Sequence, residues 1–105
     1  DGYWHASLLD PESYPSPETS ATGFIVYALA YGVNEGLLDK ATFLPVVAKG
    51  WKALVDAVDV DGKLGYVQPI GADPRKVTCD MTEVYGVGAF LMAGCQICRL
   101  AESAD

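Results

Sequence analysis

Residues 15–36, PSPETSATGFIVYALAYGVNEG, contain the stretch that decides the fold. No charged side chain lies between Thr19 and Asn34, and the apolar residues fall on every side of a helical wheel. Thr19 or Ser20 offers an N-cap oxygen, so the sequence predicts a helix over about residues 19–34. A helix that is apolar all round has to be covered all round, which makes this a core helix.

A second helix, of a different kind, is predicted within residues 37–59. Apolar side chains recur there at helical spacing, while lysines and an aspartate take the other side of the wheel. Pro45 suits the first turn of this helix, where its missing amide hydrogen would have had no partner. The apolar positions are Val47, Trp51, Leu54, Val55 and Val58. This pattern predicts a helix with one buried face and one face in solvent.

A third helix is predicted over about residues 82–100 and is again apolar nearly all round. Gly86, Gly88 and Gly94 lie inside it, and each glycine costs about 0.5–1 kcal/mol relative to alanine, which suggests close backbone packing or a crowded polar site nearby. Residues 59–63 predict a turn, and residues 63–70 a short extended segment. Neither apolar helix reaches the roughly 20 residues that a bilayer core demands, so no membrane partner is expected.

The chain also repeats itself, over residues 1–60 and 61–105. Asp1-Gly2 returns as Asp61-Gly62, and each copy continues through an extended segment and a proline-containing loop into an apolar helix. The alignment sets Thr19 on Thr82, Gly23 on Gly86, Tyr27 on Phe90 and Ala30 on Ala93. An order of apolar, amphipathic and apolar helix is typical of a double-layered ring. We therefore expect one all-α segment, 1–105, with short extended segments in its loops, that is too short to close such a ring.

Charge and cysteine content exclude several classes of function. The chain carries 14 acidic residues against seven lysines and arginines, a net charge of −7, so nucleic acid is not an expected partner. Cys79, Cys95 and Cys98 fit neither a disulfide framework nor a four-ligand zinc site, and the last two are expected to be inert core thiols. His5 is the single histidine and is interpreted as a hydrogen-bonded structural residue. No metal and no cofactor is predicted.

Polar residues precede both apolar helices, at residues 17–20 (PETS) and 79–83 (CDMTE). In a ring of helices the N-terminal ends of the inner helices share one rim, where free amides and the positive end of the helix dipole meet a polar ligand. Plain capping is the alternative: Ser20 or Thr82 would cap its helix, and a neighbouring glutamate would complement the dipole. The first segment adds aromatic rings that suit either sugar faces or core packing, namely Tyr3, Trp4 and Tyr14.

No pair of carboxylates stands out for acid and base catalysis of glycoside hydrolysis. The candidates are Asp10, Glu12, Glu18, Asp80 and Glu83, and no spacing among them singles out a pair. Asp10 and Glu12 are most simply turn residues. Asp59, Asp61 and Gly62 also predict a turn, because the acids that a calcium loop needs further along are missing.

Taken together, the D-G-x-W start at Asp1, the S-Y followed by E-T-S at Glu18, and the Y-G-x-G at Tyr85 resemble the C-terminal portion of the unsaturated glucuronyl and rhamnogalacturonyl hydrolases. These are glycoside hydrolase families 88 and 105, whose fold is an (α/α)6 barrel. The resemblance runs in order through nearly the whole chain. It implies a metal-independent enzyme that protonates the C4–C5 double bond of an unsaturated uronic acid ending a pectin or glycosaminoglycan fragment, so that water adds, the ring opens and the sugar is released.

The resemblance also implies roles for single residues. The acid/base aspartates of the family lie on earlier inner helices and match no position here, so the catalytic residues are unassigned and the isolated chain is expected to be inactive. The matched positions are Trp4, Thr19, Ser20 and Tyr85 as substrate-side wall and Glu18 as a residue that orients its neighbours.

Two further questions stay open at the level of sequence. A non-catalytic carbohydrate-binding or helical interaction module is the alternative to an enzyme fragment, and the location can be the periplasm or the cytoplasm of a bacterium.

Because one amphipathic helix cannot cover two apolar ones, we expect a homo-oligomer or packing onto the missing part of the barrel. The surfaces concerned are those of Phe24, Tyr27, Tyr31, Phe90 and Met92.

Overall fold

Three helices make up the chain, in a computed structural model that describes residues 1–71 and 74–103. They are α1 (Thr19–Asn34), α2 (Lys40–Asp56) and α3 (Val84–Glu102), with a short 3-10 helix, η1, at Pro74–Lys76. Among the described residues the pairing of extended chain is limited to an isolated antiparallel bridge between Val58 and Leu64. The predicted all-α fold with short extended segments in its loops is confirmed.

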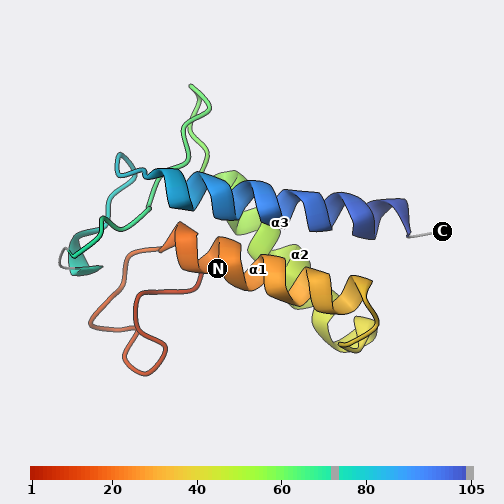
Figure 1. Cartoon of the computed structure of the whole chain (residues 1–105). Coiled ribbons are helices and arrows are strands. Elements are labelled where there is room, and N and C mark those ends of the chain that lie inside the picture. The colour runs from red at the N-terminus through yellow and green to blue at the C-terminus, as the bar shows by residue number, and fades with distance from the viewer. Residues whose placement is uncertain (72–73, 104–105) are drawn as a thin grey trace.

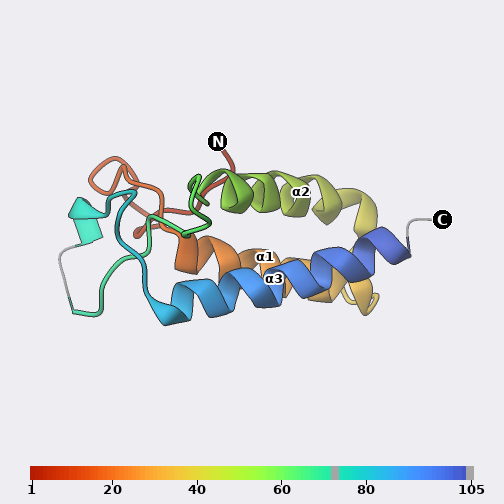
Figure 2. The ribbon, with the colours of Figure 1, turned by 90° about the horizontal axis from the view of Figure 1, so that it is seen from above.

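The helices form two layers. α1 and α3 lie side by side and run in the same direction (Figure 1). Seen from above, α2 forms a second layer and runs the opposite way (Figure 2). This is the predicted order of inner, outer and inner helix. The core lies between the layers and is built from seven buried residues: Val26, Ala30, Val33, Val47, Leu54, Ala93 and Leu100.

Glycines allow the close packing that the sequence suggested. A Cβ atom at Gly23 would lie 2.9 Å from the Cβ of Ala89, so the backbones of α1 and α3 approach each other at this point. The space beside Gly86 is occupied by Val67, whose Cγ2 would lie 2.5 Å from a Cβ added at Gly86. Gly88 is different, since nothing lies within 4 Å of the position of its Cβ. A Cβ atom at Gly94 would lie 3.2 Å from Cη2 of Trp51 on the outer helix. Of the three glycines predicted inside the third helix, close packing thus explains Gly86 and Gly94 but not Gly88.

Two details predicted for α2 are wrong. The helix begins at Lys40, because Asp39 caps it by accepting a hydrogen bond from the Thr42 amide at 2.9 Å, so Pro45 lies in the second turn and not the first. Val55 was expected on the buried face, yet it is 47% exposed. The buried stripe of α2 consists instead of Val47, Gly50, Ala53 and Leu54.

One side of the α1–α3 layer is bare, which also corrects the prediction for the cysteines. Phe24, Tyr31 and Met92 are each more than 40% exposed, and Tyr27 and Phe90 are half-buried. Cys95 and Cys98 lie on the same helix and are exposed, not buried in a core, because nothing in the described chain covers that face of α3.

The expectation that both apolar helices are too short to span a membrane is wrong for α3. This helix is long and apolar enough to cross a membrane, a property that core helices of soluble proteins share.

The loops collect at one end of the helix pair. Residues 1–18 and the connection from α2 to α3 both lie near the N-terminal ends of α1 and α3, while the turn from α1 to α2 lies at the other end (Figure 1). The N-terminal ends of the two inner helices therefore share one rim with the polar segments that precede them.

Candidate functional site

The carboxylate of Glu18 forms the centre of this rim. Glu18 is 1% exposed and stands in extended conformation immediately before α1. Its oxygens accept hydrogen bonds from the amides of Ser20 at 3.2 Å and Ala21 at 2.6 Å, and the Ser20 hydroxyl lies 2.8 Å from both of them. The prediction that Thr19 or Ser20 caps α1 is wrong. Glu18 is the N-cap residue, and its side chain accepts from the free amides of Ser20 and Ala21 in the first turn.

The same carboxylate holds a loop that lies 50 residues further along the chain. The amide of Gln68 donates to Glu18 Oε1 at 3.1 Å. Next to it, the Thr19 hydroxyl donates to the carbonyl of Gly65 at 2.7 Å, and the Thr19 amide donates to the carbonyl of Tyr66 at 2.9 Å. A buried carboxylate requires such donors, since it would otherwise lose the stabilisation that water gives it. Residues 65–68 are therefore fastened to the start of α1.

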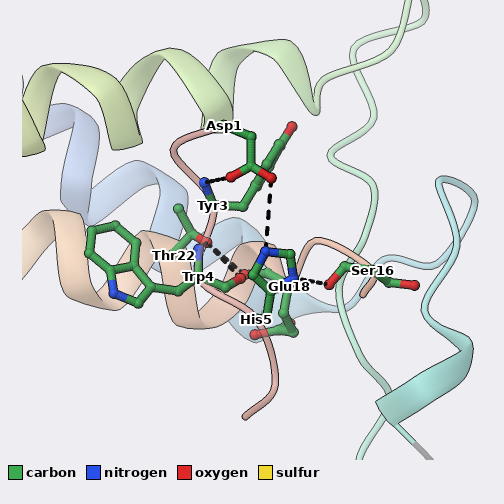
Figure 3. A network of polar contacts seen from close by, with 7 residues as sticks. All are labelled: Asp1, Tyr3, Trp4, His5, Ser16, Glu18 and Thr22. Carbon is green, nitrogen blue, oxygen red and sulfur yellow. Dashed lines mark hydrogen bonds and ion pairs between the residues drawn. The ribbon is translucent and has the colours of Figure 1, made fainter. Parts of the chain in front are cut away.

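Trp4 joins this network through its backbone. Its amide donates to the Thr22 hydroxyl at 2.9 Å, and its carbonyl accepts from the Glu18 amide at 3.2 Å (Figure 3). The indole points away from Glu18 in Figure 3 and packs beside Gly50 of the outer helix. It lines a cavity of about 460 Å³ together with Asp1, Gly2, Tyr3, Pro45, Val46 and Lys49. The indole thus packs against the outer helix and the edge of the core.

Tyr85 completes the network from the first turn of α3. Its hydroxyl donates to the carbonyl of Gln68, the residue that Glu18 holds by the amide. Burial raises the pKa of the Tyr85 phenol, and the charges of Glu83 and Glu18 raise it further. The phenol therefore stays protonated and remains a donor at neutral pH.

The structure brings all five predicted site residues into one set of contacts. Glu18, Thr19 and Ser20 meet at the start of α1, Tyr85 is linked to them through Gln68, and Trp4 is linked by its backbone. Glu18, Thr19 and Ser20 are all buried, and their side chains bind groups of this chain. Their contact with a substrate stays a prediction.

Sequence reasoning missed three residues of this network: Thr22, Tyr66 and Gln68. Thr22 is fully buried and its hydroxyl also donates to the Glu18 carbonyl at 2.8 Å. Tyr66 has a φ of 60°, which is uncommon for a residue other than glycine. Gln68 carries a buried side-chain oxygen without a hydrogen-bond partner. No local spacing could have revealed Tyr66 and Gln68, because their partners lie far away along the chain. Thr22 bonds Glu18 one helical turn earlier, a contact that any threonine in a helix can make, so its link to Trp4 had no signal either.

The remaining candidates lie outside the network. His5 Nδ1 is 2.9 Å from the Ser16 carbonyl, the structural hydrogen bond that was expected. Glu83 precedes α3 but makes no capping bond with its side chain, and Thr82 does not cap the helix either. Asp59 accepts from the amides of Asp61 and Lys63, as the predicted turn requires. The other carboxylates, Asp10, Glu12 and Asp80, are exposed. In residues 1–71 and 74–103 no group of three or more potential metal ligands comes together.

Comparison with known proteins agrees with the geometry. The profile of Glycosyl Hydrolase Family 88 matches residues 1–101. An unsaturated 3S-rhamnoglycuronyl hydrolase from Formosa agariphila is 50% identical over 97% of this chain and 27% of its own length. A protein of the same description from an Alteromonas species is 45% identical over 92% of this chain and 24% of its own. The chain thus spans about a quarter of the length of these curated relatives.

Two solved structures share the fold. One, described as a polysaccharide lyase, has a TM-score of 0.91 and 51% identity, and the match covers 97% of this chain and 30% of the other. A family 88 glycosyl hydrolase from Bacteroides vulgatus has a TM-score of 0.88 and 43% identity, over 93% and 29% of the two chains. The family profile, the sequence identities and the two-layered helices lead to one conclusion: the chain belongs to glycosyl hydrolase family 88 and forms part of an (α/α)6 barrel.

Proposed function

We propose that this chain is part of an enzyme that hydrates the C4–C5 double bond of an unsaturated uronic acid at the end of an oligosaccharide. The observation that carries the proposal is the match with two unsaturated rhamnoglycuronyl hydrolases over more than nine tenths of the chain. Their description favours a substrate in which the unsaturated uronic acid is attached to rhamnose. The sequence alone suggested pectin or glycosaminoglycan fragments and did not name the neighbouring sugar.

The proposed reaction needs one proton donor and one water molecule. A proton adds to C4, and the positive charge that develops at C5 is shared with the ring oxygen. Water then adds to C5 and returns a proton to the enzyme. The resulting hemiketal opens to a ketone at C5, and the hemiacetal left at C1 breaks down and releases the neighbouring sugar. The sum is the uptake of one water molecule, without oxidation or reduction. The acid that starts this sequence would come from a part of the protein outside this chain.

The contribution of this chain is a polar rim. The amides and the positive dipole ends at the start of α1 and α3 suit the carboxylate and hydroxyls of a uronic acid. Glu18 would orient this rim, because its carboxylate accepts from the amides of Ser20 and Ala21 at the start of α1 and from the amide of Gln68, and so fixes residues 65–68. Ser20 and Tyr85 would stand on the substrate side with Thr19 behind them, and Trp4 would support the start of α1 through its backbone contacts with Thr22 and Glu18.

The bare face of α1 and α3 would pack against the rest of the barrel or against a second copy of this chain. Phe24, Tyr31 and Met92 expose large apolar surfaces there. Exposed apolar surface of this kind is normally covered by another part of the protein or by a partner. Light scattering on the isolated chain tests whether this face needs a cover from outside the chain: an oligomer or poor solubility supports the proposal, and a monomer that binds no hydrophobic dye contradicts it.

A spectroscopic assay tests the proposed reaction. The full-length protein that contains this chain is mixed with an unsaturated uronic acid linked to rhamnose, and the ultraviolet absorbance of the double bond is followed. We expect the absorbance to fall with the full-length protein and to stay constant with the isolated 105 residues. Constant absorbance with the full-length protein would contradict the proposal. A rise in absorbance on the saturated polymer would indicate lyase chemistry, which the description of one structural relative makes the second candidate.

A further inference from the structure

Gln68 is fixed at the rim from two directions. Its amide donates to the buried carboxylate of Glu18 at 3.1 Å, and its carbonyl accepts from the hydroxyl of Tyr85. One contact comes from the residue that caps α1 and the other from the first turn of α3. The backbone at Gln68 is therefore held in place independently of its side chain.

The side chain of Gln68, in contrast, is left without a partner. Its Oε1 atom is buried, and no hydrogen-bond donor reaches it from any residue that the structure describes. Leaving a buried acceptor unpaired costs about 1–3 kcal/mol. Native proteins contain few such groups, and each one calls for an explanation.

The backbone two residues earlier is also unusual. Tyr66 has a φ of 60°, and its amide and carbonyl are held by the Thr78 carbonyl at 3.1 Å and the Thr19 amide at 2.9 Å. A residue other than glycine stays in this conformation only where its surroundings enforce it, and such positions cluster at ligand sites. Two unfavourable features thus occur within three residues of the same loop.

The other glutamine of the chain provides a contrast. Gln96 lies on α3, is 9% exposed, and its Oε1 accepts from Asn34 Nδ2 at 2.9 Å and from Arg99 Nη1 at 3.1 Å. The fold therefore satisfies a buried glutamine oxygen where the role of that residue is structural.

We propose that the Gln68 amide is a specificity-determining group that binds a hydroxyl of the sugar ligand; the inference rests on the proposed function. Gln68 as a residue is partly exposed although its oxygen is buried, so the side chain lies at the boundary between the core and the rim. The last torsion of a glutamine is broad and nearly two-fold, so the amide can turn and present either end. A sugar hydroxyl is both donor and acceptor and pairs with either one.

Two matched variants of the full-length protein test this inference: Gln68→Met and Gln96→Met. Methionine is close to glutamine in shape and has no amide. Gln68→Met loses no hydrogen bond in the free protein, so its melting temperature should stay the same or rise, while KM for the unsaturated oligosaccharide rises about ten-fold, the equivalent of one hydrogen bond. Gln96→Met should lower the melting temperature and leave KM unchanged.

The opposite result would overturn the inference. If Gln68→Met keeps KM within about two-fold of wild type, the amide binds no sugar, whatever its effect on melting. A fall in melting temperature with unchanged KM would further show that another part of the protein supplies the missing donor. An inactive wild-type protein would instead contradict the proposed reaction. Calorimetry with a saturated oligosaccharide then decides the inference separately: weaker binding by Gln68→Met supports it, and equal binding or no binding by wild type overturns it.

Discussion

The two ends of the α1–α3 pair are built in different ways. At the C-terminal end, Asn34 Nδ2 donates to both the carbonyl and the Oε1 of Gln96, and Arg99 links Gln96 to Glu35 with an ion pair of 2.9 Å. Helix contacts helix directly there, and the buried amide is satisfied. At the N-terminal end, Glu18 fastens loops to the helices while Gln68 stays unpaired. One end is arranged for stability, and the other leaves one buried oxygen, Oε1 of Gln68, without a partner beside a fixed backbone, a cost that proteins accept at binding sites.

The largest effect is expected from Glu18→Ala. The change leaves the amides of Ser20, Ala21 and Gln68 without their acceptor and releases residues 65–68. Hydrogen bonds to a charged group contribute about 1.5–3 kcal/mol each, so the free energy of unfolding should fall by about 3 kcal/mol or more. Chemical denaturation of the full-length protein measures this. A loss below about 1 kcal/mol would show that the rim does not depend on the carboxylate.

A smaller effect, restricted to stability, is expected from Asn34→Ala at the other end. The variant removes both hydrogen bonds to Gln96, one of which satisfies a buried oxygen. The free energy of unfolding should fall by about 1–2 kcal/mol, with KM unchanged. Thermal melting and steady-state kinetics on the same preparation check both parts. A several-fold rise in KM would remove the distinction between a structural end and a binding end.

The smallest effect concerns Tyr85 at high pH. Because the folded protein raises the pKa of this phenol, its contribution to stability is complete below about pH 10 and is lost as the pH rises through the raised value. Wild type should therefore lose stability relative to Tyr85→Phe above about pH 10. Denaturant midpoints at several pH values measure the difference, with Tyr31→Phe on the exposed side of α1 as control. A constant gap between wild type and Tyr85→Phe would mean that burial does not hold the proton.

Much of the fold could be predicted because its signals are local. The uninterrupted apolar run after Thr19 predicts the helix observed as α1, and the apolar and charged positions around Trp51, spaced as in an amphipathic helix, predict α2. Pro45 does not mark the start of α2, because Asp39 caps the helix six residues earlier and the helix tolerates proline in its second turn. Exposure of Val55 and Cys95 could not be predicted either, because it depends on which neighbours the chain has in space.

The candidate site was predictable only where a motif is continuous in sequence. Glu18, Thr19 and Ser20 stand together, so their place at the start of a helix could be inferred before their contacts were known. Gln68 has no such signal, because its importance comes from a carboxylate 50 residues away and a phenol 17 residues away. Nor does the sequence show that the Trp4 indole turns toward the outer helix. Long-range hydrogen bonds carry this part of the site, and they become visible only in the folded chain.

The most direct measurement is a crystal structure of the full-length protein with an unsaturated disaccharide bound. We expect the sugar at the N-terminal ends of α1 and α3, with one of its hydroxyls about 3 Å from the Gln68 amide. We also expect Glu18 to keep its contacts with Ser20, Ala21 and Gln68. A sugar bound at the opposite end, near Gln96 and Arg99, or in the cavity beside Trp4 and Lys49, would contradict the account.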